Sequence, residues 1–388
     1  MAPPFAFLAH GKVHVQNGAG SARTYESAFG ESVRERALAT HKRNEWKHQG
    51  RGGDFMARSL LWGGPGGDPE AILVSATNLT RGPKAGELYY AMNVDGRTAV
   101  CALRTEDGLE RRLIHGSERR IGDLAGSPGR EQVVCSVFHK DMTASIALMS
   151  ADATDITEVT EGESQDAGPS WVMGEGRRVV YHSAGVGRDA AGRPTGLGPS
   201  EIHVLDVDQA QIQTLASDRS SDLISPRMLA DGTLYYIQKP WRHGYEGGFW
   251  RSLLDFVLSP VRLLFAVFQF LNFFTARYTG KPLTTASGPR RERADIRQMM
   301  VWSNLMQAQE ASADGDEPKA EVPSSWKLVR RSPSGEVKNL AAGVACFDVG
   351  ADGSLLYSTG SAVYTMDAAG ARERVAVFPG VRQVVRLG

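Results

Sequence analysis

Short apolar runs alternate with turn residues along most of this chain. The apolar side chains recur at every second position over five to eight residues, and Gly, Asp and Ser separate the runs. This periodicity predicts antiparallel strands rather than helices. One stretch differs, because residues 249–274, FWRSLLDFVLSPVRLLFAVFQFLNFF, are densely apolar and carry no such turns.

The strand-like runs form units that repeat along the chain. Five runs end with an apolar residue three places before a turn residue, and these anchors are Leu113, Val159, Leu215, Leu340 and Val377. Successive anchors are 46, 56, 125 and 37 residues apart, and without residues 241–324 the longest spacing falls to 41. A period of about 40 residues is typical of the blades of a β-propeller.

The same order of runs recurs inside each unit. RRVVYHSAG, GTLYYIQKP and GSLLYSTG are second runs, whereas EIHVLDVD and AVYTMDAAG are third runs. Asp231-Gly232 and Asp352-Gly353 precede second runs and predict tight hairpin turns. Each unit is therefore expected to form a small antiparallel sheet.

One unit resembles a known repeat. Residues 168–183, GPSWVMGEGRRVVYHS, place Pro169-Ser170-Trp171 at the opening positions of the WD40-like Pro-Asp repeat of TolB-type β-propellers. The sequence departs from the motif at residues 172–176, where Ser-Pro-Asp-Gly would stand. The resemblance covers residues 85–240 and 325–388 and implies an all-β propeller fold.

Counting the units predicts a six-bladed propeller. AILVSATNL, GELYYAMNVDG, TAVCALRTEDG and LERRLIHG make one blade, and residues 117–162, 163–218, 219–343 and 344–380 supply four more. The sixth blade is split between the termini. FAFLAHG and KVHVQNG near the start are its middle strands, and VRQVVRLG at the end is its inner strand. Such pairing closes the ring and leaves no open sheet edge between the first and last blades.

This count predicts three parts. Residues 1–240 form the first part of the propeller, residues 241–324 form a helical, apolar insertion in the fifth blade with an acidic linker, and residues 325–388 close the propeller.

Near the N-terminus, residues 31–50 predict a helix at the propeller rim, because they contain no Gly or Pro before their end. Two interpretations stay open for this helix: packing across the rim through Val33, Leu38 and Trp46, or contact of its basic side with a partner or lipid.

Composition narrows the classes of partner. Lys plus Arg and Asp plus Glu each count 44 in 388 residues, so the net charge is zero and no nucleic-acid partner is expected. Cys101, Cys135 and Cys346 each lie inside an apolar run and are interpreted as buried free thiols. The N-terminal MAPPFAFLAHGK lacks the basic region of a signal peptide, which favours a cytoplasmic protein.

Motifs of common enzymes are missing from the sequence. It contains no Gly-x-Ser-x-Gly elbow, no complete phosphate-binding loop and no histidine pair with metal-ligand spacing. We therefore expect no catalytic, cofactor-binding or metal site and no cofactor. The alternative is a hydrolase-like enzyme with its active site at the propeller mouth, which would gather His139, Asp141 and His182 in one pocket.

The apolar segment carries an ordered polar stripe. Arg251, Asp255, Ser259, Arg262 and Gln269 follow helical spacing, and apolar side chains surround them. A helix lying in the bilayer interface suits such a stripe. A transmembrane span needs about twenty uninterrupted apolar residues, which this stretch lacks. Burial against the propeller or against a second copy of the chain is the third interpretation.

Basic residues follow the apolar segment and favour an anionic lipid surface. The residues assigned to membrane binding are Trp250, Leu253, Leu254, Val257, Leu258, Leu263, Leu264, Phe265, Phe268, Phe270, Leu271, Phe273, Phe274, Arg277, Lys281, Arg290 and Arg291.

The function expected from these features is a non-catalytic propeller scaffold or adaptor. Its amphipathic insertion would attach it peripherally to the inner face of the cell membrane, where it would bind anionic membrane lipid and an unknown protein partner. Self-association through the insertion stays open. A TolB-like envelope interaction protein is a further alternative, which the missing export signal weakens.

Overall fold

The structure is a computed structural model that describes residues 3–18, 20–44, 74–94, 97–116, 119–174, 176–241 and 318–387. The chain divides into two compact units. The first comprises Met1–Trp241 and Asn304–Gly388, and the second, Arg242–Ser303, lies outside the described residues.

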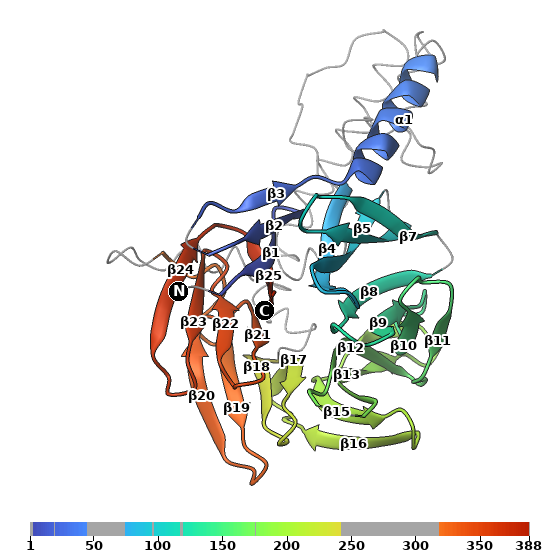
Figure 1. Cartoon of the computed structure of the whole chain (residues 1–388). Coiled ribbons are helices and arrows are strands. Elements are labelled where there is room, and N and C mark those ends of the chain that lie inside the picture. The colour runs from blue at the N-terminus through green and yellow to red at the C-terminus, as the bar shows by residue number, and fades with distance from the viewer. Residues whose placement is uncertain are drawn as a thin grey trace, which may run out of the picture. The chain divides into compact units, whose positions relative to one another are not determined.

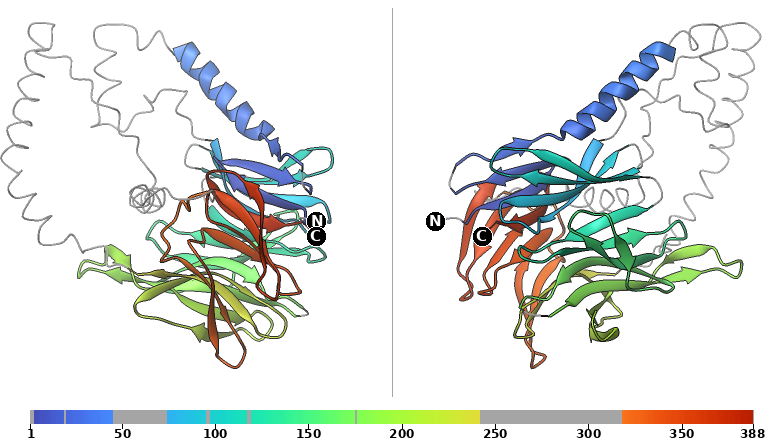
Figure 2. Two further views of the ribbon diagram at one scale, coloured as in Figure 1. Left: turned by 90° about the vertical axis from the view of Figure 1, so that its left-hand side faces the viewer. Right: turned by 45° about the vertical axis from the view of Figure 1, so that its right-hand side comes forward.

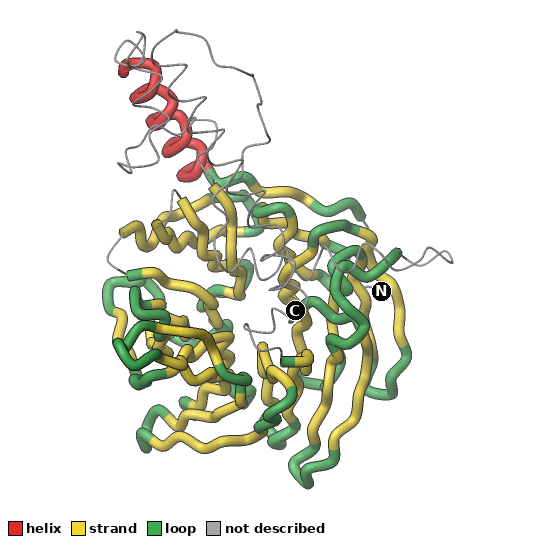
Figure 3. The backbone as a smooth tube through the Cα atoms, turned by 180° about the vertical axis from the view of Figure 1, so that it is seen from behind, coloured by secondary structure: helices red, strands yellow, loops and turns green. Residues whose placement is uncertain are grey.

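Strands dominate the described part of the first unit (Figure 1), and Figure 3 shows the same unit from behind. Four sheets have four strands each. The sheet ordered β25-β1-β2-β3 contains β1 (Phe5–Ala9), β2 (Lys12–Gln16), β3 (Arg23–Tyr25) and β25 (Val381–Arg386). The next contains β4 (Val74–Arg81), β5 (Glu87–Val94), β6 (Arg97–Arg104) and β7 (Glu110–Gly116). Another contains β17 (Ser221–Met228), β18 (Leu234–Pro240), β19 (Lys327–Arg331) and β20 (Val337–Ala342). The fourth contains β21 (Cys346–Val349), β22 (Leu355–Ser358), β23 (Ala362–Met366) and β24 (Arg372–Val377).

A fifth sheet has nine strands and consists of two antiparallel groups. The first group is β8 (Arg120–Ala125), β9 (Gln132–Phe138), β10 (Ala144–Ser150) and β11 (Ile156–Glu158). The second is β12 (Ser164–Trp171), β13 (Arg178–Arg188), β14 (Pro194–Leu197), β15 (Glu201–Asp206) and β16 (Gln211–Ala216). A single parallel bridge, Ala144↔Gln165, joins the groups.

The two ends of the chain pair in one sheet, as the sequence predicted. Phe5 is opposite Arg386 and Leu8 is opposite Gln383, so β25 and β1 are antiparallel neighbours, and β1 pairs with β2 on its other side. This part of the prediction is confirmed. The runs GELYYAMNVDG and TAVCALRTEDG likewise contain β5 and β6.

Middle strands are apolar on both faces because every sheet packs against two others. In β18, Tyr235 and Ile237 belong to the core cluster shared with β21–β23, whereas Leu234 and Tyr236 belong to the cluster shared with β13, β15 and β16. Clusters of the same kind lie between the other neighbouring sheets and between the two groups of the nine-stranded sheet. The continuous apolar run LYYI at the start of β18, which departs from strict alternation, is therefore explained by burial of both faces of the strand.

The sheets are arranged around a common centre (Figure 1), and side chains link each sheet to the next. Gln383 of β25 accepts a hydrogen bond from Leu79 N of β4 (2.8 Å) and donates one to Leu79 O (2.7 Å). Asn78 of β4 accepts from Leu124 N of β8 (2.8 Å), and Asp123 of β8 accepts from Gly168 N of β12 (3.0 Å). These three side chains stand near shifts of strand register.

The remaining links complete the circuit. His182 Nδ1 of β13 accepts from Ser225 N of β17 (3.4 Å), and Arg227 of β17 forms an ion pair with Asp348 of β21 (3.8 Å). Asp348 then accepts from Arg386 N of β25 (2.9 Å), which returns the chain of contacts to its starting strand. We call these contacts the polar ring.

Hairpin turns predicted from Asp-Gly pairs are confirmed. Gly232 and Gly353 have φ of 87° and 77°, a left-handed conformation that favours glycine. Asp231 accepts a hydrogen bond from Thr233 N (2.8 Å), and Asp352 accepts one from Ser354 N (3.0 Å). The hydrogen bonds from the Thr233 backbone and the Ser354 hydroxyl hold the pKa of Asp231 and Asp352, respectively, below the usual value.

Helix α1 (Ala28–Asn44) begins beside β4 and extends away from the strands, as both views in Figure 2 show. It corresponds to the helix predicted near residues 31–50. Val33 packs against the neighbouring core cluster, while Leu38 and Trp46 lie outside the part whose side chains are described.

The polar ring predicts a large effect from one side chain. Gln383→Ala should lower the free energy of unfolding by about 1–3 kcal/mol, because it removes both partners of the fully buried Leu79 backbone. Its exposed neighbour is the matched control, and Arg382→Ala should change stability by less than about 0.5 kcal/mol. Chemical denaturation measures both values. Equal stabilities for the two variants would contradict the role of the ring.

The hairpin turns predict part of the acid sensitivity. The pKa values of Asp231 and Asp352 are lower in the folded chain than in the unfolded chain, where they are about 3.9. Both carboxylates therefore stabilise the folded chain above the unfolded pKa, and this stabilisation is lost as pH falls through the folded pKa. Asn keeps the turn acceptor without the charge. The Asp231→Asn, Asp352→Asn variant should therefore show a thermal midpoint less dependent on pH between about 5 and 3. Parallel curves for parent and variant would refute this assignment.

Candidate functional site

The base of α1 is held closely against the sheet β4–β7. Ser27 precedes the helix, and its hydroxyl accepts a hydrogen bond from Gly30 N (3.0 Å), as an N-cap does. A Cβ on Gly30 would lie 2.4 Å from Val74 Cγ1 of β4, so glycine permits the close approach. Phe29 packs between His115 (ring centroids 5.0 Å apart) and the Arg112 guanidinium, 5.0 Å from the ring centroid.

A carboxylate from a distant strand completes the helix cap. Glu110 of β7 accepts hydrogen bonds from Ser27 Oγ (2.9 Å), Ala28 N (2.9 Å) and Phe29 N (3.4 Å). Negative charge is favourable beside the unpaired N–H groups of a helix start. Glu110 thereby fixes where α1 leaves the sheet.

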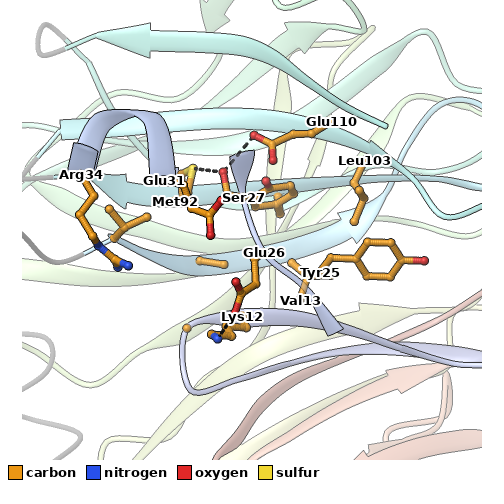
Figure 4. Close-up of a pocket in the computed structure, with 14 residues that line it drawn as sticks. Lys12, Val13, Tyr25, Glu26, Ser27, Glu31, Arg34, Met92, Leu103 and Glu110 are labelled. Carbon is orange, nitrogen blue, oxygen red and sulfur yellow. Dashed lines mark hydrogen bonds and ion pairs between the residues drawn. The ribbon is translucent and has the colours of Figure 1, made fainter. Parts of the chain in front are cut away.

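A pocket of ≈ 100 Å³ lies beside this cap, and we call it the helix-base pocket (Figure 4). Lys12 of β2 and Glu26 form an ion pair at its edge, and Glu31 and Arg34 of α1 also line it. Tyr90, Met92 and Leu103 contribute to its wall. The pocket thus combines charged groups of both signs with an apolar wall.

Titratable groups near the pocket are kept neutral by burial. Burial raises the pKa of the Tyr90 hydroxyl, which also lines the pocket, far above its usual range. Burial raises the pKa of the Cys101 thiol to about 12. Reactive cysteines are thiolates at neutral pH, so Cys101 is not activated as a nucleophile. The contacts at the helix base therefore serve to position α1.

His139, Asp141 and His182 are the residues expected at an enzyme's active site. His139 contacts Glu158 Oε2 (3.1 Å), whereas Asp141 contacts Thr143 Oγ1 (2.7 Å) and the Arg188 guanidinium (3.3 Å). His182 instead serves the polar ring. It lies six residues before Arg188 on β13, about 20 Å along the strand. None of these contacts joins His182 to His139 or Asp141, and the gathering of the three residues in one pocket stays a prediction.

The cysteine interpretation is confirmed. Cys101, Cys135 and Cys346 are free and buried. Burial raises the pKa of Cys135 and of Cys346 to about 12 as well. All three are packed as small apolar residues in the clusters between sheets.

All seventeen residues assigned to membrane binding, from Trp250 to Arg291, lie outside the described residues. Within the described ranges, no helix has the length and apolarity needed to cross a membrane. In the same ranges, no group of three or more His, Cys, Asp or Glu side chains is placed to hold a metal ion.

Sequence reasoning missed the residues that organise the site. Ser27 is a visible N-cap type, but Glu110 lies 83 residues away and acts through tertiary proximity. Gln383 and Leu79 are 304 residues apart. No local pattern signals either contact.

Comparisons with known proteins establish the fold at a coarse level. No family model matches the sequence, and no curated protein matches it. The chain is similar to a chain of the crystal structure of the nidogen/laminin complex, with a TM-score of 0.51, 9% identity, and coverage of 99% of this chain and 98% of that one. It is also similar to TolB from Acinetobacter baumannii, with a TM-score of 0.50, 10% identity, and coverage of 99% and 66%.

Together with the strand content, these likenesses identify a β-propeller. Identity this low shows the fold alone. The sequence resembles the WD40-like Pro-Asp repeat family of TolB-type propellers. The similarity to TolB supports the propeller fold of that family, and no family model matches the sequence.

The capping carboxylate makes a direct prediction for α1. Glu110→Ala should speed amide hydrogen exchange at Ala28 and Phe29, because both amides lose their acceptor, at a cost of about 0.5–2 kcal/mol in local stability. Glu35→Ala, which removes an exposed carboxylate further along the same helix, is the control and should leave exchange at both amides unchanged. Exchange followed by NMR or mass spectrometry decides between them. Unchanged exchange in Glu110→Ala would contradict the cap.

Proposed function

We propose that this protein is a six-bladed propeller scaffold that binds the inner face of the cytoplasmic membrane peripherally and presents its propeller to a protein partner. Residues 1–240 and 325–388 constitute the propeller in this proposal, and residues 241–324 constitute an apolar insertion. The segment from Trp250 to Phe274, with its basic flank, contacts anionic lipid.

The blade count is supported by the arrangement of strands. Four sheets have four strands each, and the nine-stranded sheet separates at its single parallel bridge into two antiparallel groups. Dividing that sheet at the bridge yields six groups, and the polar ring links these groups in sequence.

One observation carries the proposal of an appended segment. Strands β18 and β19 pair directly, with Gln238 opposite Lys327 and Leu234 opposite Arg331, although residues 241–326 separate them in the chain. A hairpin ladder that continues in register tolerates long additions at its turn. Residues 241–324 can therefore serve another contact without interrupting the sheet.

The physical case for lipid rests on the sequence of that segment. Each large apolar side chain that leaves water contributes about 1.5–3 kcal/mol as an upper value, and the segment contains more than a dozen. Each basic residue beside an anionic surface adds about 1 kcal/mol, which salt weakens. Arg277, Lys281, Arg290 and Arg291 are placed in the sequence to add this second contribution.

Liposome flotation tests the proposal. The intact protein should float with anionic vesicles at low salt, and Phe265→Asp with Phe268→Asp should reduce the bound fraction at least about tenfold. The matched control places Asp at two exposed apolar positions of described strands, Ile212→Asp with Val337→Asp, and should float like the parent. Vesicles of neutral lipid should bind less, and added salt should remove that difference.

Two outcomes would overturn the membrane contact. The intact protein could stay in the soluble fraction with anionic vesicles at low salt. Alternatively, the Phe265→Asp, Phe268→Asp variant could lose several degrees of thermal midpoint, which would mean that the segment is packed against protein. A dimer that dissociates in this variant would identify a second copy as the occupant.

An envelope interaction protein is a second candidate, which the fold similarity to TolB favours. Cell fractionation separates the two candidates: the scaffold should be recovered with the inner membrane from the cytoplasmic side, and an envelope protein from the far side.

A further inference from the structure

A second pocket, of ≈ 250 Å³, lies between neighbouring sheets where their hairpin turns meet, and we call it the turn pocket. One wall comes from β18, β19 and β20, and the other comes from the β21–β22 and β23–β24 turns. Leu229, Leu355 and Met366 line its apolar part, where the core cluster between the two sheets ends. None of this belongs to the helix-base pocket.

The strand register places three polar donors in one row on the first wall. Tyr235 of β18 is opposite Arg330 of β19, and Arg330 is opposite Lys338 of β20. Residues directly opposite across a ladder project from the same face of a sheet. Like charges held opposite each other are unfavourable, and neither cation has an ion-pair partner within 4.0 Å among the described residues.

The tyrosine supplies an independent indication of a ligand. The Tyr235 side chain is 4% exposed and lines the pocket, and its hydroxyl has no hydrogen-bond partner among the described residues. A Cβ on Gly353, in the opposite wall, would lie 3.4 Å from this hydroxyl, so the oxygen points across the pocket. Burial raises the pKa of Tyr235, which keeps the hydroxyl a donor at neutral pH.

The second wall is acidic. Asp352 Oδ1 accepts from the Ser354 hydroxyl (2.6 Å), and Asp367 Oδ1 accepts from Ala371 N (2.7 Å). In the described structure, the Oδ2 atom of each carboxylate has no hydrogen-bond donor. Asp231, beside the cationic row, already uses both oxygens on Thr233. The pocket therefore separates unpaired positive groups on one wall from carboxylate oxygens on the other.

We propose that the turn pocket binds a small zwitterion of the amino-acid or dipeptide class. The ligand carboxylate would lie between Arg330, Lys338 and the Tyr235 hydroxyl, its ammonium group between Asp352 and Asp367, and an aliphatic side chain against Leu355 and Met366. Such charge-assisted hydrogen bonds are the stronger kind. The volume equals that of about eight waters at about 30 Å³ each, which suits a ligand of this size. The proposal is independent of membrane attachment.

The test uses the dipeptide glycyl-leucine with the intact protein, together with N-acetyl-glycyl-leucine, which is an anion, and glycyl-leucine amide, which is a cation. Calorimetric titration should show saturable binding of the zwitterion, at least about tenfold tighter than that of either capped form. Lys338→Gln and Asp367→Asn should each weaken binding about tenfold, because each removes one charge at one end of the ligand. Tyr235→Phe should weaken it by a smaller factor.

Matched variants outside the pocket control for nonspecific charge effects. Lys140→Gln and Asp155→Asn change exposed residues of the same types and should bind glycyl-leucine like the parent. Asn at position 367 keeps the acceptor for Ala371 N, and thermal unfolding verifies that each variant is folded. The proposal is overturned if glycyl-leucine shows no saturable binding up to about 10 mM. It is equally overturned if the capped forms bind as tightly, or if the control variants weaken binding to the same extent.

Discussion

The closed circuit of polar contacts around the innermost strands is the constraint on which the rest of this structure depends. Each innermost strand has a ladder partner on its outer side, and side chains such as Asn78, Asp123 and Gln383 contact the backbone of the next innermost strand. An unpaired buried backbone group costs free energy comparable to a lost hydrogen bond. The last link joins Asp348 to Arg386 of the C-terminal strand β25, which itself pairs with β1. Because the circuit is closed, separating any one sheet from the rest would break contacts on two sides.

Apolar packing between sheets follows from this closure. Every sheet has two neighbours, so its middle strands bury side chains on both faces, as Tyr235 and Tyr236 show on opposite sides of β18. The outer strands β16, β20 and β24 are largely exposed and carry polar side chains. Exposed polar residues on a short edge strand disfavour pairing with the strands of other chains. Additions are then tolerated at turns and rims. Helix α1 is added beside β4 with its own cap from Glu110, and residues 241–326 are added between two strands that remain paired.

The sequence predicted the parts of the fold that depend on local pattern. Period-2 runs located the strands, Asp-Gly pairs located the hairpins at Gly232 and Gly353, and the terminal runs predicted that β25 would join β1. It did not predict individual side-chain contacts between distant residues, such as Gln383 with Leu79 or Glu110 with Ala28, because these depend on tertiary proximity. The sequence predicted an insertion within the fifth blade, but it did not predict the register that places Tyr235, Arg330 and Lys338 in one row of the turn pocket.

Native-state hydrogen exchange tests the central claim most directly. The amides of Leu79, Leu124, Gly168 and Arg386 each donate to a side chain of the polar ring, and they come from four different strands. If the ring makes the propeller one cooperative structure, their exchange free energies should converge on the global free energy of unfolding as denaturant is added. Separate values, each well below the global one and each following its own sheet, would show that the sheets open independently and would contradict this account.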